Sequence, residues 1–373
     1  MNRAGGCWPN PAQLLLLRAA LLDDAGAVRD AWLGWKRVAL LDAIDGGSHR
    51  LLPLVYSNLT RAGVDDPLLN KLKGVYRKTW YRNHLLLREI TTVLRAFEAA
   101  GIRSMLMKGL ALSQLYYGDL GLRPMDDVDL LVPVDQTRSA VAVLQELGWR
   151  AKPPWSERRA NAFNESNFFS PSGAMIDLHW HLLPEFCERD AEDDLWAAAR
   201  STSVAGIRVA TLAPTDELFL AFTHGVRWNF MPPLRWVADA FMILRSAAAD
   251  ISWERLVAAA QRHRMTLPIR AALRYLHTHL DVDAPAALSQ LDRSPVSMNE
   301  RCEFAMRVSS RLNAALGCLP LYILNALRVR AARGWPAARE GFIYQLESQW
   351  DCQGLRQLGA QAIMRGIRRA RAL

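Results

Sequence analysis

The spacing of apolar and polar residues divides the centre of the chain, residues 102–133, into short elements of two kinds. Short apolar runs predict strands, and an amphipathic stretch between them predicts a helix. Glycine and proline mark the turn and the loop that join these elements. The elements expected in order are a strand over 102–107, a turn at Lys108 and Gly109, a helix over 110–117 and a strand over 127–132.

Two carboxylates share one face of the second expected strand. Asp127 and Asp129 are two residues apart, so both side chains leave the same side of the pleat. Val128 and Leu130 then point to the opposite face, which we expect to be buried. Carboxylates this close repel each other unless a cation lies between them, and oxygen ligands of this kind suit magnesium.

Helical spacing dominates the chain on both sides of this segment. We expect a helical region at 1–100, an α/β core at 101–185 and a second helical region at 186–373. Within the core, 167–170 and 174–181 predict the arms of a hairpin, and the proline-rich segment 150–160 predicts a loop. Helices are expected over 12–22, 27–43, 49–61, 66–100, 136–147, 190–199, 215–224, 234–244, 253–263 and 268–279, and an extended piece over 207–210.

The second hairpin arm, which reads AMIDLHWH, carries a third carboxylate. As a strand it places Asp177, His179 and His181 on one face and three apolar residues on the other. Beside the strand of Asp127 and Asp129, Asp177 would complete a site with three carboxylates. Such a site can hold two divalent ions that clamp the attacking and leaving oxygens of a phosphoryl displacement. The two histidines are candidates for groups that orient the carboxylates, for metal ligands or for bases.

The segments MKGLALSQLYYGDLGLRPMDDVDLLVP and MIDLHWHL resemble a bacterial family of uncharacterised nucleotidyltransferases in the polymerase-β nucleotidyltransferase superfamily. The resemblance covers roughly residues 45–280. It implies an α+β fold with a small mixed sheet between helical regions. It also implies Mg²⁺-dependent transfer of a nucleoside monophosphate from a nucleoside triphosphate, with two ions (Mn²⁺ as a possible substitute) at Asp127, Asp129 and Asp177.

The turn after the first strand departs from the superfamily pattern, which has Gly-Ser there. Lys108 and Gly109 occupy the turn, and Leu110 follows. Gly109 still permits backbone N–H groups to approach phosphate at a helix start, and Lys108 offers a charge in place of the hydroxyl. Ser113 lies one helical turn further on. We predict that Lys108, Gly109 and Ser113 contact the donor.

Basic residues outside the strands supply further candidates for substrate binding. Arg123 either contacts phosphate or orders the site by pairing with Asp126 or Asp119, and Asp126 is better explained as a loop cap than as a ligand. His224 and Arg227 are one helical turn apart, with Trp228 beside them. This group suits either the binding of a base and a phosphate or the packing of two domains, and both interpretations stay open.

The net charge of +9 is concentrated at the C-terminal end. Residues 301–373 contain twelve arginines against four acidic residues. This tail is either a surface for nucleic acid, an anionic membrane or another anionic partner, or a solvated helical face. The five cysteines are scattered without a CxxC motif, which indicates a reducing compartment. With no convincing signal peptide and no apolar stretch long enough to span a bilayer, we expect a cytoplasmic protein.

Two other classes of function remain open at this point. One is an inactive binding module for nucleotide or nucleic acid, although three clustered carboxylates would serve no purpose in it. The other is a metal-dependent phosphohydrolase with Asp177, His179 and His181 as ligands, which leaves Asp127 and Asp129 unexplained. The acceptor of a transferase is equally open: a small molecule, a peptide or protein side chain, or an RNA end.

Overall fold

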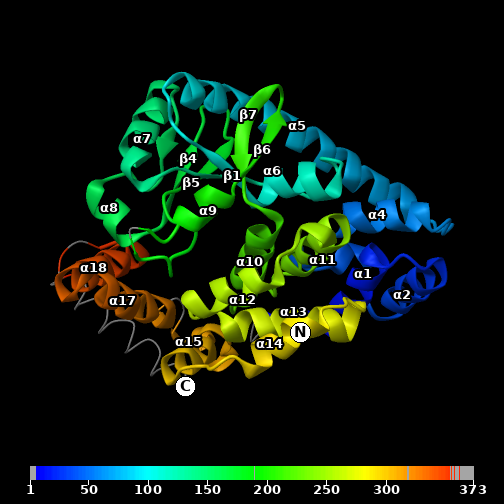
Figure 1. The fold of residues 1–373 in the computed structure, drawn as a ribbon. Helices are drawn as coiled ribbons and strands as arrows, with labels where there is room; N and C mark the ends of the chain where they lie inside the picture. The colour runs from blue at the N-terminus through cyan, green and yellow to red at the C-terminus, as the bar shows by residue number, and fades with distance from the viewer. Residues whose placement is uncertain are drawn as a thin grey trace.

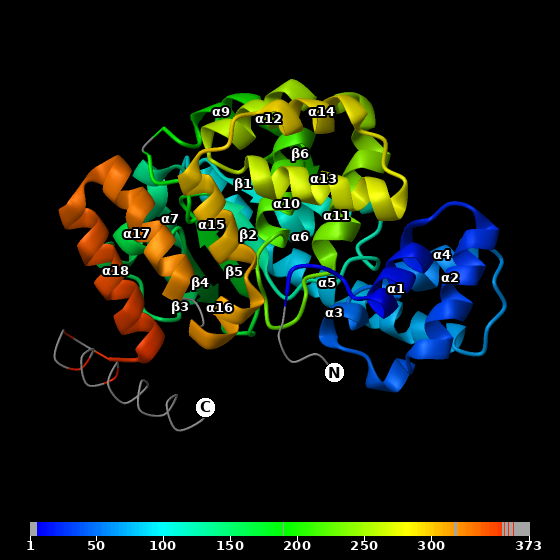
Figure 2. The same cartoon turned by 90° about the horizontal axis from the view of Figure 1, so that it is seen from below.

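The computed structural model describes residues 6–188, 190–316 and 319–352, together with residues 354, 357 and 361. The chain begins with four helices that lie together, coloured blue in Figures 1 and 2, and a fifth helix that runs along the sheet. Their bounds are α1 Pro11–Leu21, α2 Ala25–Val38, α3 Gly46–His49, α4 Leu52–Arg61 and α5 Leu69–Ala99.

A mixed seven-stranded sheet follows, in the order β3-β4-β5-β2-β1-β7-β6. β2 runs parallel to β5 and β1 runs parallel to β7, whereas the other neighbouring strands are antiparallel. The parallel pairing of β2 with β5 lies at the centre of the sheet. The strands are β1 Met105–Met107, β2 Val128–Leu131, β3 Arg150–Ala151, β4 Glu165–Phe169, β5 Met175–His179, β6 Arg200–Val204 and β7 Ile207–Thr211.

Helices connect the strands and form the rest of the described chain. Those between strands are α6 Lys108–Leu112, continued by a π-helical turn over Ser113–Tyr117, then α7 Thr137–Glu146, α8 Glu157–Ala162 and α9 Asp193–Ala198. Those after the sheet are α10 Pro214–Gly225, α11 Arg235–Ala247, α12 Trp253–Arg262, α13 Thr266–Leu280, α14 Pro285–Arg293, α15 Met298–Val308, α16 Ser310–Leu316, α17 Leu319–Arg333 and α18 Trp335–Trp350. α18 packs against α8, so the end of the described chain returns to the sheet.

Two clusters of buried apolar side chains hold these elements together. One lies between the sheet and α5, α6 and α7, and includes the fully buried Phe97 and Phe168. The other joins α1, α2 and α4 to α10, α11, α12, α13 and α14. Within it, the indole of Trp236 on α11 donates to the carbonyl of Cys7 at 3.4 Å. Helices that precede the sheet in the sequence and helices that follow it therefore share one core.

Local signals explain several helix boundaries. Asn10 caps α1, because its side chain accepts from the backbone of Gln13 at 2.9 Å and the Gln13 side chain accepts from the backbone of Asn10 at 2.9 Å. Ser252 caps α12 by accepting from the backbone of Arg255 at 3.2 Å. Gly334, with a φ of +86°, separates α17 from α18.

The α+β class with helical regions on both sides of a mixed sheet is confirmed. The expected loop over 150–160 is wrong in part, because β3 and the start of α8 lie inside it. The sequence RSTSV of β6 has no apolar alternation, so no strand is predicted there. β6 pairs with β7 through a turn at Ala205 and Gly206, whose φ values are +50° and +81°. The sheet therefore extends beyond the expected core boundary at residue 185. Within the described ranges, no helix combines the length and apolar character that crossing a membrane requires.

Two helical glycines should respond to alanine in opposite directions. A Cβ on Gly225 would lie 2.1 Å from Cγ of Trp236, whereas a Cβ on Gly74 would meet nothing within 4 Å. We expect Gly225→Ala to lower the free energy of unfolding by about 1–3 kcal/mol through overpacking. Gly74→Ala, at an exposed position near the start of α5, should raise it by about 0.5–1 kcal/mol. Urea unfolding of both variants measures the difference, and equal effects would contradict the close contact of α10 with α11.

Candidate active site

The pairing of β2 with β5 brings two of the expected carboxylates together. These strands run parallel with Asp129 directly opposite Asp177. Asp129, Asp177 and His179 each offer a ligand atom, and these atoms all lie within 4.8 Å of one another. Val128 and Leu130 are fully buried on the other face of β2, as the alternation predicts. One face of the sheet thus presents Asp129, Asp177 and His179 close together, and we call these three residues the acidic group.

Asp129 is the more enclosed of the two carboxylates in the acidic group, with 4% of its surface exposed. Its Oδ1 accepts from Nζ of Lys108 at 2.7 Å and lies 3.2 Å from Nε2 of His179. Burial alone would raise the pKa of this carboxyl, but the Lys108 ammonium and the His179 ring lower it well below its usual range. Asp129 is therefore ionised and already paired with a cation.

Asp177 has surroundings of the opposite kind. Its carboxylate accepts a hydrogen bond from the amide of Asn167, which stands directly opposite on β4. Burial and the charges of Asp129, Glu165 and Asp127 raise the pKa of Asp177 to about 7. The crowding of like charges around Asp177 is the condition that a bound cation relieves.

The turn at Lys108 and Gly109 is strained and closely packed. Lys108 has a φ of +47°, a left-handed conformation that is uncommon outside glycine. It starts α6 directly after β1, which brings its side chain to Asp129 on β2. Its backbone N–H lies near the buried carboxylate of Glu217 on α10 and opposes the increase that burial causes in the pKa of that group. A Cβ on Gly109 would lie 3.0 Å from Sδ of Met125, so a larger residue would displace that side chain.

Asp127 lies at the edge of the acidic group. It directly precedes β2, is partly exposed and does not belong to the close set of three ligand atoms. Burial and the charge of Asp129 raise the pKa of its carboxyl, whereas Arg235, Lys108 and Arg123 act against this increase. Asp127 is therefore placed between the acidic group and several basic residues.

Two of the candidate substrate-binding residues have side chains that bind within the protein. Ser113 is fully buried, and its hydroxyl donates to the carbonyl of Gly109 at 2.9 Å. Arg123 forms a buried bidentate pair with Asp239 on α11, at 2.8 Å from Nε to Oδ1 and 2.9 Å from Nη2 to Oδ2. Asp239 also accepts from the hydroxyl of Tyr117 at 2.8 Å. These contacts connect the segment before β2 to α11, and a role in substrate binding stays a prediction for both residues.

The carboxylates that the sequence offers as partners of Arg123 are engaged elsewhere. Asp126 is exposed and pairs with Arg50, and Asp119 accepts from the hydroxyl of Tyr76 at 2.7 Å. The pairing of Arg123 with Asp239 instead depends on the packing of α11 against the core, which no local pattern reveals.

The two histidines of the AMIDLHWH segment have different surroundings. The Nδ1 of His179 lies 3.2 Å from Oε2 of Glu165, so the ring stands between the carboxylates of β2 and β4. His181 instead contacts Glu192 through Nδ1 at 3.2 Å and Arg333 through Nε2 at 3.1 Å. His179 belongs to the acidic group, whereas His181 links the end of β5 to α17.

His224 and Arg227 lie at the end of α10 and just beyond it. His224 has an exposed surface, but many protein atoms surround its ring. The resulting desolvation, together with the charges of Lys108 and Arg227, holds its pKa well below its usual value. Arg227 interacts with the charges of Glu185 and Glu165. Among the described residues, its Nε and Nη2 have no hydrogen-bond partner although both atoms are buried. Both residues therefore lie near the acidic group, and their substrate-binding role stays a prediction.

A family model described as an uncharacterised nucleotidyltransferase matches residues 47–281, more than half of the chain. The chain belongs to this nucleotidyltransferase family. The antibiotic-resistance factor ANT(2'')-Ia is similar in structure at 16% identity and a TM-score of 0.35, over 53% of this chain and 96% of that one. A nucleotidyltransferase-like protein from Paracoccidioides brasiliensis is similar at 15% identity and a TM-score of 0.35, over 57% of this chain and 94% of that one. No curated protein sequence matches the chain.

The possible metal ligands of this nucleotidyltransferase fit a hard divalent cation. Asp129 and Asp177 supply carboxylate oxygens, the ligands that Mg²⁺ prefers, from a site that is closed on its apolar side. The imidazole of His179 is a softer ligand that suits Zn²⁺ better than Mg²⁺. Its contacts with two carboxylates make it better suited to orient them than to bind Mg²⁺ itself.

Three residues near the site are absent from the sequence-based expectation. Glu165 stands directly opposite His179 on β4, and extending the predicted arm backward by two residues would have placed it on the face of Asn167. Glu217 is the second of two adjacent carboxyls in the first turn of α10, and burial raises its pKa to about 8. Arg235 starts α11, and no sequence motif marks it as a site residue. Only the tertiary fold brings it near Asp127.

The buried pair of Arg123 with Asp239 predicts a large effect on stability. Arg123→Met leaves the Asp239 carboxylate buried without its cation, so we expect a loss of about 3–5 kcal/mol in the free energy of unfolding. Arg82→Met serves as the control, because Arg82 is an exposed partner of Asp126 at 3.5 Å and should change stability by less than about 1 kcal/mol. Urea unfolding measures both. An Arg123→Met variant of native stability that had lost activity would instead support a role of Arg123 in substrate binding.

Proposed function

We propose that the chain is a Mg²⁺-dependent nucleotidyltransferase that moves a nucleoside monophosphate, or a related phosphate-linked group, from a nucleotide donor to a hydroxyl or phosphate acceptor. The observation that carries this proposal is the register of two parallel strands that sets Asp129 opposite Asp177. Membership of the nucleotidyltransferase family supports it independently. The expected division into a helical region at 1–100, a catalytic core at 101–185 and a helical region at 186–373 is part of the same proposal, with β6 and β7 added to the core because they extend its sheet.

Asp127, Asp129 and Asp177 are the residues that would hold the ions. Bound there, two divalent ions supply charge stabilisation for both oxygens of an in-line displacement at phosphorus. His179 orients Asp129 through the contact at 3.2 Å, and Asn167 orients Asp177. Lys108 is placed to exchange its contact with Asp129 for a phosphate oxygen of the donor.

In the proposed reaction, a bond forms between an acceptor oxygen and the α-phosphorus of the donor. The bond between that phosphorus and the bridging oxygen breaks, and pyrophosphate leaves with the electron pair. The proton of an acceptor hydroxyl passes to a carboxylate of the acidic group or to water. Donor phosphates are proposed to bind at the start of α6, where Lys108, with its left-handed backbone, and Gly109 follow β1 directly.

Two finer inferences complete the proposal. The scattered cysteines favour a cytoplasmic location. The basic C-terminal tail is proposed to contact an anionic partner through its last part, most of which lies outside the described residues. The described arginines Arg307, Arg328 and Arg333 bind within the protein instead.

Removal of a single carboxylate charge should abolish transfer. We expect Asp129→Asn and Asp177→Asn to lower Mg²⁺-dependent pyrophosphate release from labelled nucleoside triphosphates by more than about 100-fold, since each removes a proposed metal ligand. Asp126→Asn is the matched control: the same change at an exposed residue of the same segment should retain activity. Full activity in either of the first two variants would show that the metal site is misassigned.

Lys108 and a divalent cation should compete for Asp129. The Lys108→Met variant is therefore expected to bind Mn²⁺ at least several-fold more tightly, while its turnover of nucleotide falls. Electron paramagnetic resonance of Mn²⁺ measures the binding, and pyrophosphate release measures the turnover. Lys71→Met, which removes an exposed partner of Asp42, should change neither. Unchanged or weaker Mn²⁺ binding by Lys108→Met would rule out the competition.

A further inference from the structure

A cavity of about 180 Å³ lies between the ends of β4 and β5 and the C-terminal helices. Its wall is built from the end of α8, the loop after β5, Arg227 and side chains of α15, α17 and α18. The volume is slightly larger than the engineered cavity of about 150 Å³ that accepts benzene, so it suits a molecule about the size of a sugar ring. Phe163 and Phe186 contribute apolar surface that could pack against such a ring.

Several buried polar atoms on the cavity wall have no hydrogen-bond partner within the part of the chain that the structure describes. They are Nε and Nη2 of Arg227, Oε2 of Glu185 and Oε1 of Gln345. Gln345 is only 4% exposed, and its amide nitrogen is fixed by donating to the carbonyl of Ala162 at 2.7 Å. Burying a polar group without a hydrogen-bond partner is unfavourable, so such groups in a native structure need an explanation. Together these atoms call for a ligand with both acceptors and donors.

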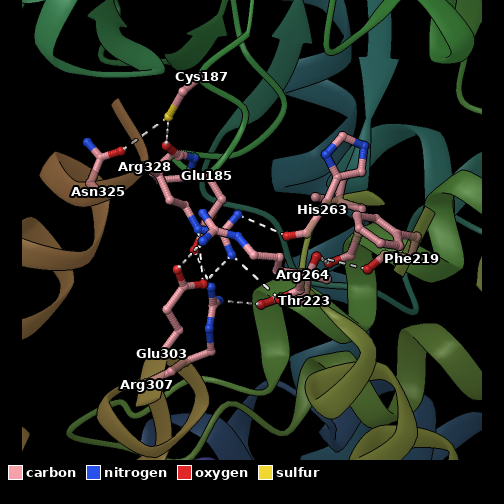
Figure 3. Close-up of polar contacts among 12 residues, drawn as sticks. Glu185, Cys187, Phe219, Thr223, His263, Arg264, Glu303, Arg307, Asn325 and Arg328 are labelled. Carbon is pink, nitrogen blue, oxygen red and sulfur yellow. Dashed lines mark hydrogen bonds and ion pairs between the residues drawn. The ribbon is translucent and has the colours of Figure 1, made fainter. Parts of the chain in front are cut away.

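The other charges of the cavity are already paired. Figure 3 shows Arg307 directed toward Glu185 and the carbonyl of Thr223, and Arg328 directed toward Glu303. Arg328 also donates to the carbonyl of His263 at 2.9 Å. These pairs fix the wall and leave Arg227 as the cation with free donors.

The balance of charge favours an anionic ligand. Four arginines and two glutamates line the cavity, so its charge is positive. Although burial opposes ionisation of Glu185, the charges of Arg307, Arg227 and Arg328 hold its pKa at about 2. Glu185 therefore remains an acceptor, which suits a hydroxyl of a ligand whose acid group binds Arg227.

The cavity adjoins the acidic group along two chain segments. Asn164 lines the cavity, and the next residue, Glu165, lies 3.2 Å from His179. His181 also lines the cavity, two residues after His179, a separation of about 7 Å along an extended chain. A molecule in the cavity would thus have one end close to the proposed metal site.

We propose that this cavity binds the acceptor of the transfer reaction, and that the acceptor is a small hydroxylated anion such as a sugar phosphate or a sugar acid. Its acid group binds Arg227, and its hydroxyls donate to Glu185 and Gln345. An oxygen of this molecule then forms the bond to the α-phosphorus, and pyrophosphate leaves as described above. This assignment rests on the proposed function, because it names the acceptor of that reaction.

A wider groove offers a route into the cavity. The groove and the cavity share Asn161, His181, Cys187 and Arg333. Arg333 donates to the carbonyl of Cys187 at 2.6 Å and contacts His181 at 3.1 Å. The side chain of Arg333 therefore stands at the boundary that an entering molecule would cross.

Binding can be tested separately from catalysis. Calorimetric titration of the full chain and of its Asp129→Asn variant uses three probes: glucose 1-phosphate, gluconate and glucose. We expect both proteins to bind one or both anions and to bind glucose at least tenfold more weakly. A preference for glucose 1-phosphate identifies a phosphate source of the anion, and a preference for gluconate identifies a carboxylate source. Failure to bind either anion, or equal binding of glucose, overturns the proposal.

Variants of the wall test the location. Arg227→Met should weaken binding of the preferred anion at least tenfold, whereas Arg330→Met, an exposed arginine of α17 outside the cavity wall, should not. Thermal unfolding checks that each variant is folded. If Arg227→Met does not fold, Leu321→Trp fills the cavity without removing a charge and should abolish binding. Undiminished binding in the folded variant overturns the assignment.

The two proposals fail in different ways. Anion binding without pyrophosphate release from any nucleotide would retain the cavity as an anion site but overturn the proposed function and, with it, the role of the anion as acceptor. Pyrophosphate release with other acceptors, but no binding of these probes, would retain the function and overturn the assignment of the acceptor.

Discussion

The register of β2 against β5 is the constraint on which the rest of the site depends. Parallel pairing sets the carboxylates of Asp129 and Asp177 opposite each other on two strands whose other face carries buried apolar side chains. Two such charges in a partly buried position repel each other strongly, so neighbouring groups must compensate. Lys108 does so from a left-handed backbone conformation, which persists only because surrounding contacts determine it. The buried carboxylate of Glu217 provides one of these contacts, so α10 helps to hold the strained turn beside the acidic group.

The helices before and after the sheet pack together around one apolar core, and α10 and α11 carry residues that lie near the acidic group. Their shared apolar core fixes α10 and α11 relative to β1 and β2, and the buried pair of Arg123 with Asp239 adds a polar connection across the boundary. α10 carries Glu217 at the turn and His224 at its end, and Arg227 follows two residues after it. One helix therefore reaches both the proposed donor site and the cavity. A change in the packing of α10 would affect both.

The alternation of side chains along each strand predicted the acidic group, because the face to which a strand residue points depends only on its position in that strand. Asp127, Asp129, Asp177 and His179 follow from it directly, and the sequence motifs identified the family that the match over 47–281 confirms. What the local pattern does not reveal is how helices pack on the sheet. Ser113 is fully buried by that packing, and its hydroxyl donates to the carbonyl of Gly109. The partner of Arg123 comes from 116 residues further along the chain. No local pattern carries that information.

The arginine excess near the C-terminus has a different meaning in the structure than in a count of charges. A basic count predicts a surface for anions, but Arg307 and Arg328 are 3% and 5% exposed and pair with glutamates. Arginine tolerates such burial because its planar fork satisfies several acceptors at once. The consequence is a region of positive charge around the cavity inside the protein, next to the negatively charged acidic group. Glu165 and His179 mark where the two regions meet, with the carboxylates on one side and Arg227 on the other. A small molecule with an acid group would be oriented by this gradient before any specific contact forms, with its acid end held away from the carboxylates.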